Sequence, residues 1–599
     1  MVEDAHWCDS ASWALARLVA QQIPTALLVL ALRPLTEPIP EAYQRLRQAS
    51  GAQQLRLDPL PAEDVAALVG QRLGVTSVPQ PVTELIGEHA GGNPFFSEEL
   101  AYTLRDSGVI TISNGSCRIA PDADLQDLSL PETVQGVVLA RIDRLAPPQQ
   151  LTLKVASVIG RSFAYRLLHD IYPIAADRPT LAGQLVGLQQ RSLVLPEAPD
   201  LELAWIFKHV ITRDVAYELM VRTQRRALHQ AIAEWYEQHH QGELPRFYPL
   251  LAYHWGRTDV AAKAVQFLGL AGERALEGGA YREAVLFLTA ALDRDPAPQD
   301  GGEVARFRRA RWERQLAEAH LGFGGTGKGR LHLGRALELL GTPLPKTNRQ
   351  LGASVLRQLT LQAVHRAFPN QAVGQGRRPP EESLEASRAY MRLTEVFWFA
   401  NDVPALVHAS LQALNQAEQA GPSPELARAY SIMCLAAGSV PIHPLARAYA
   451  LRAVQTARGT GQLWPLGYVR FITCVYLIGA ARWAELHDAL AEAQGLLEQA
   501  GDRRALGDAL TVQAMSSLYR GEFQGAAAGF DDVQQRGRRD ENIQHQVWGL
   551  LGKAECLLRA GEWGEAAQLL EAALALLTDH PDQAEQLRAY GLLAVMRLR

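Results

Sequence analysis

Cysteine is scarce in this sequence and never occurs in closely spaced pairs. An odd number of widely separated thiols argues against a disulfide framework and against CxxC-type zinc sites. The N-terminus also lacks the charged-then-apolar pattern of a secretory signal. We therefore expect a soluble, cytoplasmic protein with reduced thiols. The five cysteines among the 599 residues are Cys8, Cys117, Cys434, Cys474 and Cys556.

Long apolar runs and a large net charge are missing as well. No stretch approaches the roughly 18 apolar residues that a membrane-spanning helix needs. The formal net charge is −5, with 59 basic and 64 acidic residues interleaved along the chain. Such a balance presents no broad charged surface to nucleic acid or to an anionic membrane. We expect neither as a direct partner.

What is present begins with an α/β pattern over residues 1–60. "TALLVLALRP" (25–34) is an apolar run typical of a strand buried on both faces of a parallel sheet, and "QQLRLDPL" (53–60) is a candidate second strand. The chain opens "MVEDAHWCDSAS", in which two apolar residues precede the acidic pair Glu3-Asp4. On the residues alone, this pair is either an acidic cap of the following helix or the acidic end of a nucleotide-binding strand.

From Pro61 the pattern becomes helical. "PAEDVAALVGQRLG" carries proline at its first turn and glycine at its end, which is ordinary helix punctuation. Later, "SLVL-PEAPD-LELAWIF" predicts a hairpin among helices, with proline and polar residues at its bend. Helices closing on such a hairpin predict a winged-helix-like domain, although they lack the concentrated basic face of a DNA reader.

Beyond residue 225 the sequence repeats itself. Each copy places a small turn residue before an aromatic residue, and an amphipathic helix follows. Trp483, Phe523 and Trp563 lie forty residues apart, and the same step leads back to weaker copies at His443 and Val403. Helix pairs of this kind cover their apolar faces only by stacking on their neighbours. The pattern therefore predicts a superhelical array like that of tetratricopeptide repeats (TPR-like).

The predicted fold is mainly α: a partial α/β segment, a winged-helix-like domain, and then a TPR-like α-solenoid. A chain of 599 residues is long enough for about four domains. The predicted boundaries are 1–60 for the α/β core segment, 61–125 for a helical lid, 126–225 for the winged-helix-like domain, 226–345 for a helical linker with the first repeats, 346–385 for a helical joint and 386–599 for the array.

One stretch imitates a phosphate-binding loop. "GFGGTGKG" (322–329) matches G-x-x-x-x-G-K, but Gly329 follows Lys328 where a magnesium-binding hydroxyl is required. An amphipathic helix, not a buried strand, leads into it. We interpret the stretch as a turn between paired helices of the array.

Several motifs occur together in an order known from one family. The sequence resembles the signal-transduction ATPases with numerous domains (STAND), in particular the bacterial branch joined to class III adenylate/guanylate cyclases or to protein kinases. The resemblance covers nearly the whole chain. Its motifs are "VEDAHWCDSAS", "LLVLALRP", "GGNPFFSEEL", "LARIDRL" and "FKHVITRDVAYELMVRTQRRALHQAIAEWYE", followed by the helical repeats.

The resemblance implies that the first segment is a partial α/β P-loop-type ATPase remnant. Glu3 and Asp4 match the acidic pair of its Walker B strand, the catalytic residues, where one carboxylate would orient Mg²⁺ through water and the other would polarise the attacking water. Arg33 matches the sensor-1 arginine, which would read a γ-phosphate. A solvated arginine at a strand end is the alternative.

The resemblance also implies nucleotide contacts from the later motifs. Gly92, Asn93 and Pro94 match the Gly-x-Pro motif of the lid, which lies near the adenine, although on sequence alone they form a turn between helices. His209 follows the wing strand and lies where related switches sense the β-phosphate of ADP. A helix-capping or satisfied core histidine is the alternative.

In the resembled family, the phosphate-binding loop lies upstream of the acidic pair. We therefore expect this chain to be a fragment, or a product with a misplaced start. ATP or ADP with Mg²⁺ would bind to the complete protein, which could oligomerise, and no tight binding to this chain is expected. We predict a regulatory ATP-binding signalling protein, weak or inactive as an ATPase alone, whose array binds protein partners. The alternatives are a TPR scaffold without nucleotide binding and an ATP-dependent transcription regulator lacking its DNA-binding module.

Overall fold

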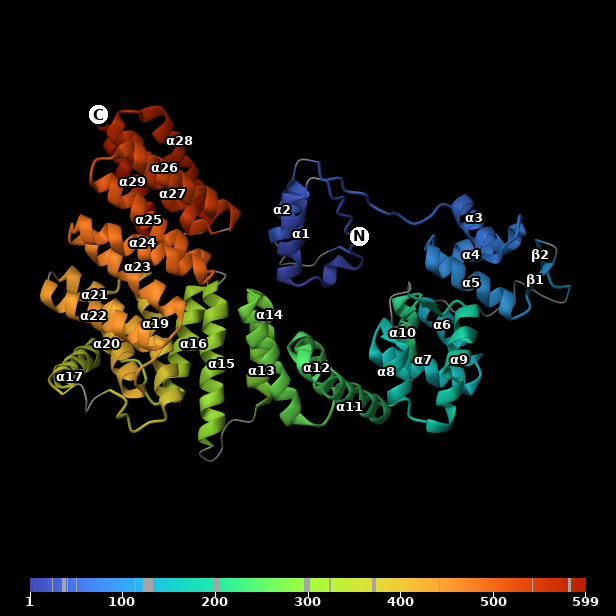
Figure 1. Ribbon diagram of the computed structural model, residues 1–599. Coiled ribbons are helices and arrows are strands. Elements are labelled where there is room, and N and C mark those ends of the chain that lie inside the picture. The colour runs from blue at the N-terminus through green and yellow to red at the C-terminus, as the bar shows by residue number, and fades with distance from the viewer. Residues whose placement is uncertain are drawn as a thin grey trace. The chain divides into compact units, whose positions relative to one another are not determined.

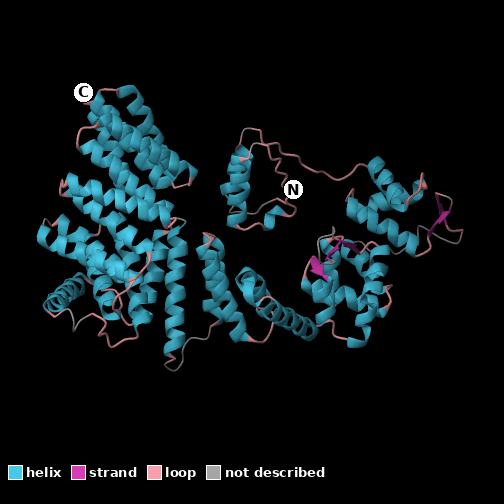
Figure 2. Ribbon diagram, in the orientation of Figure 1, coloured by secondary structure: helices cyan, strands magenta, loops and turns pink. Residues whose placement is uncertain are grey.

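A computed structural model of the chain shows two compact units, Met1–Asp295 and Pro296–Arg599. Helices dominate both (Figures 1 and 2), which confirms the predicted mainly α class. Within the described residues, no helix is both long and apolar enough to cross a membrane. The structure describes residues 1–23, 25–34, 39, 41–49, 51–113, 115–121, 133–197, 204–295, 302–322, 325–368, 373–440, 442–540, 542–579 and 583–598.

The first segment forms a single parallel bridge, in which Val2 pairs with Leu30. The Val2 amide donates to the Val29 carbonyl at 2.8 Å, and the Ala31 amide donates to the Val2 carbonyl at 2.9 Å. Asp9, not the acidic pair, caps the helix that follows, because its carboxylate accepts from the Ser12 amide at 2.6 Å. The helices here are η1 (Ala5–Trp7), α1 (Ser10–Gln22) and α2 (Glu41–Gln48).

The predictions of a buried strand at 25–34 and of a second strand at 53–60 are wrong. Leu27 is 87% exposed and Val29 is 41% exposed, so the run at 25–34 is not covered on both faces. Residues 53–60 are extended without forming a strand, and Leu55 and Leu57 are exposed. An apolar run becomes a buried strand only where other elements pack against it, and among the described residues none packs on Leu27.

Three helices and a hairpin follow around one apolar core. Val65, Val69, Ile86, Leu100 and Leu104 lie in that core. Gly74 ends the first of the three helices in the left-handed conformation (φ 68°), which glycine adopts without steric cost. These elements are α3 (Ala62–Leu73), α4 (Gln80–Ala90), α5 (Pro94–Asp106), β1 (Ile110–Ser113) and β2 (Ser116–Ile119).

The next elements surround a three-stranded antiparallel sheet of order β3-β5-β4. The predicted hairpin is present, with Val194 opposite Phe207, and its bend at 198–203 lies outside the described residues. The elements in chain order are α6 (Val134–Asp143), α7 (Pro147–Ile159), β3 (Ser162–Ala164), α8 (Tyr165–Ile171), η2 (Ala175–Thr180), α9 (Leu181–Gln190), β4 (Val194–Pro196), β5 (Ala204–Phe207) and α10 (Val210–Glu218).

Helices complete the first unit. A buried pair, His229 and His254, joins two of them through a 2.8 Å contact between their Nδ1 atoms. Burial lowers the pKa of His254 to about 3, so this pair is neutral above mildly acidic pH. The elements are α11 (Arg222–His239), η3 (Gln241–Phe247), α12 (Tyr248–Trp255), α13 (Ala261–Glu277) and α14 (Tyr281–Arg294).

The second unit is an array of antiparallel helix pairs, as predicted. Val403, His443, Trp483, Phe523 and Trp563 are each the first residue of a helix. The helices are α15 (Glu303–Gly322), α16 (Thr326–Leu339), α17 (Asn348–Ala367), α19 (Pro380–Phe399), α20 (Val403–Ala420), α21 (Pro424–Ser439), α22 (His443–Gly459), α23 (Leu463–Gly479), α24 (Trp483–Gln499), α25 (Arg503–Tyr519), α26 (Phe523–Arg539), α27 (Ile543–Ala560), α28 (Trp563–Asp579) and α29 (Gln583–Arg597).

The small turn residue of the repeat has a geometric cause. Asn401, Ala481, Gly521 and Gly561 each lie two residues before a repeat helix, and their φ angles are 52°, 52°, 82° and 89°. Only glycine and a few other residues enter this left-handed region at low cost. The turn therefore favours glycine and asparagine, and Ala481 adopts the same conformation at a steric cost.

The stretch that imitates a phosphate-binding loop lies between two paired helices. Thr326 begins α16, which pairs with α15, while residues 323–324 lie outside the described residues. Gly329 is buried, and a Cβ there would lie 2.7 Å from the Leu321 side chain. Its glycine therefore permits close helix packing, which agrees with our interpretation.

Candidate functional site

The acidic pair shares one guanidinium group from a distant part of the chain. Arg161 Nη1 donates to Asp4 Oδ2 at 2.9 Å, and Nη2 donates to Glu3 Oε2 at 3.3 Å. The side chains are 60% exposed at Glu3, 39% at Asp4 and 35% at Arg161. Water screens contacts at this exposure, so they add little stability. These contacts matter because they connect the acidic pair at the start of the chain with Arg161, which lies far away in the sequence.

Arg33 lies at the same end of the bridge as the acidic pair. Its backbone amide donates to His6 Nδ1 at 3.5 Å, and the Ala5 amide donates to the Ala31 carbonyl at 2.9 Å. The Arg33 residue is exposed. The structure thus brings Glu3, Asp4 and Arg33 to one edge. Phosphate reading by Arg33 stays a prediction.

Gly92, Asn93 and Pro94 form the entry to α5. The Asn93 side chain accepts from the Phe96 amide at 3.2 Å and so caps the helix, while Pro94 is the first helical residue. Gly92 (φ 75°) accepts from the Leu60 amide at 2.8 Å, and a Cβ there would lie 2.6 Å from the Leu60 carbonyl oxygen. Turn formation accounts for all three residues, and their contact with a nucleotide stays a prediction.

His209 meets this turn from the other side. Its ring centroid lies 3.9 Å from that of Phe95, the residue after Pro94. His209 occupies the N-cap position of α10, where its carbonyl accepts from the Thr212 amide at 3.1 Å but its side chain makes no capping bond. Its Nε2 is buried, and no protein group among the described residues lies within hydrogen-bonding distance of it.

Beside His209 lies a group of charged residues that the sequence analysis did not single out. We call it the lid cluster. Glu98 pairs with Lys208, accepts from the Tyr102 hydroxyl at 3.2 Å and lies 3.3 Å from Arg72. Glu99 pairs with Arg141, whose guanidinium also donates to the Arg191 carbonyl. The cluster comprises Arg72, Glu98, Glu99, Tyr102, Arg141 and Lys208.

The cluster joins α5 to the elements around the three-stranded sheet. Burial raises the pKa of Glu99 in spite of the neighbouring Arg141. Burial also acts to raise the pKa of Glu98, but the hydrogen bond and charge of Lys208 outweigh it and lower that pKa. One signal in the sequence was available: two adjacent acids in "FFSEELAY" lie among apolar residues. Their partners, Arg141 and Lys208, lie 42 and 110 residues away, so no pattern in the neighbouring sequence indicates them.

The lid cluster and the acidic pair are connected through the sheet. Arg161 directly precedes β3, and its carbonyl accepts from the Phe207 amide at 2.8 Å. Lys208 and His209 directly follow β5, which pairs with β3. A displacement of Arg161 would therefore move β5, the strand that leads directly into Lys208 and His209. Both of these residues contact α5.

The stability of this region is expected to depend on pH through His209. Burial, with Lys208 as the next cause, lowers the pKa of His209 from 6.5 to about 4. The unfolded chain then binds a proton near pH 6.5 that the native chain does not, so stability falls as the pH drops from about 6.5 to 4. His209→Phe keeps a ring against Phe95 but cannot titrate, and its unfolding should depend less on pH over that range.

The control for this measurement is His239→Phe, because His239 is exposed on α11. Thermal unfolding of the full chain between pH 7 and pH 4 compares the two variants with the wild type. If His209→Phe kept the complete pH dependence of the wild-type chain, this assignment would be wrong.

The acidic pair fits a magnesium corner only in part. Two adjacent carboxylates can orient Mg²⁺ through water, but both are engaged by Arg161. Within the described part of the chain, no group of three or more His, Cys, Asp or Glu residues gathers as a metal site. Phosphate oxygens and water would have to supply the remaining ligands.

Comparison with known proteins gives distant matches. Residues 61–118, which comprise α3 to β2, match the family described as "Domain of unknown function (DUF8739)". Adenylate cyclase type 10 of Oryctolagus cuniculus is 21% identical over 342 residues, which cover 43% of this chain and 21% of that protein. An uncharacterised protein of Rhizobium meliloti is 24% identical over 301 residues, which cover 49% of this chain and 27% of that protein.

Among solved structures, one similar chain is a STAND protein with a tetratricopeptide repeat sensor from Pyrococcus horikoshii. It has a TM-score of 0.36 and 10% identity, and the match covers 95% of this chain and 80% of that one. The matches to adenylate cyclase type 10 and to the Rhizobium meliloti protein cover 21% and 27% of those proteins, so this chain spans only about a quarter of their length.

Proposed function

We propose that this chain is the switch and sensor portion of a regulatory, ATP-dependent signalling protein. In this proposal, residues 1–60 contribute to a nucleotide site, residues 61–125 act as its lid and residues 126–225 form a winged-helix-like lever. The array of the second unit binds a protein partner. The distant matches to adenylate cyclase type 10 agree with a role in signalling, and in this proposal the output domain is an attached cyclase or kinase.

One observation carries the proposal: Arg161 holds both acids of the candidate magnesium corner. The same residue is bonded to β5, which leads into Lys208 and His209 beside α5. A ligand that competes for Glu3 and Asp4 would free Arg161 and act on the lever. When bound, Mg²⁺ would supply a positive charge beside the phosphates, while Glu3 and Asp4 orient it through water.

The same observation favours a second candidate, a TPR-like scaffold that binds no nucleotide. In that case, Arg161 neutralises the acidic pair permanently and the contact is structural. The two candidates differ in whether Arg161 competes with Mg²⁺ and nucleotide for the carboxylates.

The test is a titration with a fluorescent ATP analogue and Mg²⁺. The 599-residue chain should bind with a Kd weaker than about 1 mM, because it contains no G-x-x-x-x-G-K-[ST]. The gene product that includes any coding sequence upstream of Met1 should bind saturably, and Asp4→Asn should weaken that binding about tenfold or more, which corresponds to about 1.4 kcal/mol. If a stop codon lay directly upstream of Met1, or if Asp4→Asn did not change the binding, the nucleotide proposal would be wrong. The TPR-like scaffold would then be the remaining candidate.

A further inference from the structure

Helix α17 buries two glutamines most deeply against the array, between half-buried apolar residues such as Leu351 and Val355. Only two of its residues, Gln358 and Gln362, are buried. By contrast, Leu356, Leu359 and Val364 on the same helix are 68%, 49% and 50% exposed. A helix of a globular protein normally buries its apolar stripe and exposes its amides. Figure 1 shows α17 beside α20, in the yellow part of the chain.

The buried contact is a row of hydrogen bonds along α20, which we call the amide seam. Asn415 Nδ2 donates to Gln358 Oε1 at 2.7 Å, and Gln362 Nε2 donates to Asn415 Oδ1 at 2.6 Å. Gln362 Nε2 also donates to Glu418 Oε2 at 2.6 Å, and its Oε1 accepts from the Tyr449 hydroxyl at 3.1 Å.

Basic and hydroxyl groups continue the seam at both ends. His365 Nδ1 lies 2.6 Å from Glu418 Oε2, and the Arg366 guanidinium lies 4.3 Å from the Tyr449 ring centroid. Ser354 forms a 2.9 Å hydrogen bond with His408. On the array side, His408, Asn415 and Glu418 are at most 2% exposed. The array thus presents a row of groups that are specific for a helix carrying amides four residues apart.

The chain on either side of α17 is fastened to the array independently of the seam. Arg378 donates to the carbonyls of Leu340 at 3.0 Å and Gly341 at 3.2 Å. The Tyr390 hydroxyl donates to the Thr342 carbonyl at 2.8 Å, and the Gly374 amide donates to the Glu418 carbonyl at 2.8 Å. The helix can therefore leave the seam without loosening the helix pairs next to it.

Release of α17 exposes less apolar surface than release of an ordinary repeat helix. Water can replace the partner of each seam hydrogen bond after release, so each bond contributes less than it would in isolation. The apolar contribution comes from half-buried side chains such as Leu351 and Val355, since Leu356 and Leu359 face solvent already.

We propose that α17 is a displaceable helix that occupies, within the chain, a helix-binding surface of the array. The partner that this surface takes in its place is a helix of another protein with two carboxamides four residues apart and an imidazole or guanidinium group one turn later. The inference rests on the proposed protein-binding role of the array. It needs no nucleotide, so its failure would leave the nucleotide proposal standing.

The test uses the full chain and a labelled synthetic peptide of residues 346–368. In wild type, the attached α17 competes with the peptide. The variant Gln358→Ala/Gln362→Ala weakens this competitor and leaves the array side of the seam intact. It should bind the peptide at least about tenfold more tightly than wild type does, since a loss of 1.4 kcal/mol in the competitor corresponds to tenfold. A peptide with the same two alanines should not bind.

Hydrogen exchange provides the second measurement. Amides of α17 should exchange at least about tenfold faster than those of α20 in wild type, and faster still in the double variant, while α19 and α20 remain protected. The inference would be overturned if α17 were as protected as α20. It would also be overturned if the double variant, with its array still protected, failed to bind the wild-type peptide.

Discussion

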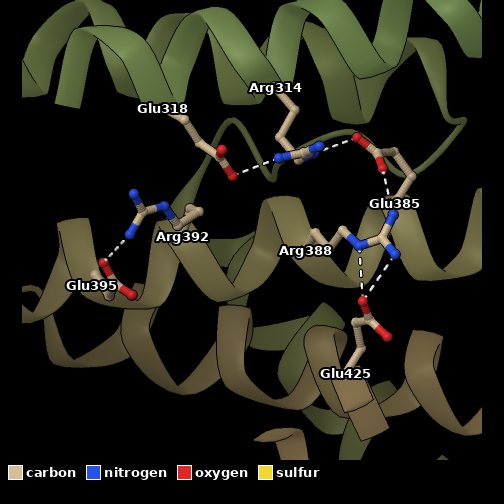
Figure 3. Close-up of polar contacts among 7 residues, drawn as sticks. All are labelled: Arg314, Glu318, Glu385, Arg388, Arg392, Glu395 and Glu425. Carbon is tan, nitrogen blue, oxygen red and sulfur yellow. Dashed lines mark hydrogen bonds and ion pairs between the residues drawn. The ribbon is translucent and has the colours of Figure 1, made fainter. Parts of the chain in front are cut away.

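Replacing Glu385 by alanine should destabilise the first repeats of the array by about 3–5 kcal/mol. The Glu385 side chain is 1% exposed and pairs with two arginines, Arg314 of α15 and Arg388 of its own helix. Arg388 in turn lies 2.9 Å from Glu425 of α21, so three helices share the network (Figure 3). Removal of Glu385 leaves Arg314, which is 9% exposed, with Glu318 as its remaining carboxylate partner.

The reason for so large an effect is that a buried arginine loses its most buried carboxylate partner and keeps only Glu318, which is 26% exposed. Burial acts to lower the pKa of Arg314, but Glu318 and Glu385 outweigh it and raise that pKa. An arginine is not deprotonated in proteins, so in the variant Arg314 stays charged with one carboxylate partner fewer. A chain of two units need not unfold in one step, so the measurement is the opening free energy of α15 and α19 amides by hydrogen exchange.

A matched control lies in the same view. Arg392 and Glu395 form a 2.6 Å pair on α19 (Figure 3), and the Glu395 side chain is 42% exposed. Glu395→Ala should cost less than about 1 kcal/mol, as is usual for exposed pairs. Equal effects of the two substitutions would show that the Glu385 network does not hold these helices together.

Replacing Arg141 by alanine should have a comparable effect in the first unit, about 3–5 kcal/mol. Arg141 and Glu99 are 4% and 1% exposed, and their ion pair joins α6 to α5. Without Arg141, the Glu99 carboxylate remains buried without its cation. The measurement is again hydrogen exchange, here of α5 and α6 amides.

The pH dependence identifies the cause of this loss. Burial already raises the pKa of Glu99 in the wild-type chain, and removal of Arg141 should raise it further. A native state that binds a proton more readily than the unfolded chain gains stability as the pH falls. The deficit of Arg141→Ala should therefore shrink at acidic pH, and the additional change Glu99→Leu should recover part of it at neutral pH.

The control for Arg141 is Arg105→Ala. Arg105 pairs with the adjacent Asp106 at 2.8 Å, with side chains that are 37% and 24% exposed. We expect a loss below about 1 kcal/mol. A loss from Arg141→Ala that was equally small, or that did not depend on pH, would contradict the role assigned to the lid cluster.

The candidate site shows which residues a local sequence pattern can identify and which it cannot. Sequence motifs identified Glu3, Asp4, Arg33 and His209 by resemblance, and the structure places the first three at one edge and His209 against the turn after Gly92. Arg161 escaped notice, because it lies 157 residues from Asp4 and has no motif of its own. The strand predicted at 25–34 failed for a related reason: its apolar pattern is local, whereas burial depends on what packs against it.

The sequence by itself determined where the repeat helices begin. Each start depends on a residue that tolerates the left-handed turn and on a period of apolar residues, both of which act over a few neighbouring positions. Only the tertiary structure decided which charges meet, as in Arg161 with Asp4, Arg141 with Glu99 and Arg314 with Glu385. It also decided that α17 buries Gln358 and Gln362 while Leu356 and Leu359 stay exposed. The physical reason is that an ion pair or a buried amide depends on a partner brought close by folding, and nothing in the adjacent residues specifies that partner.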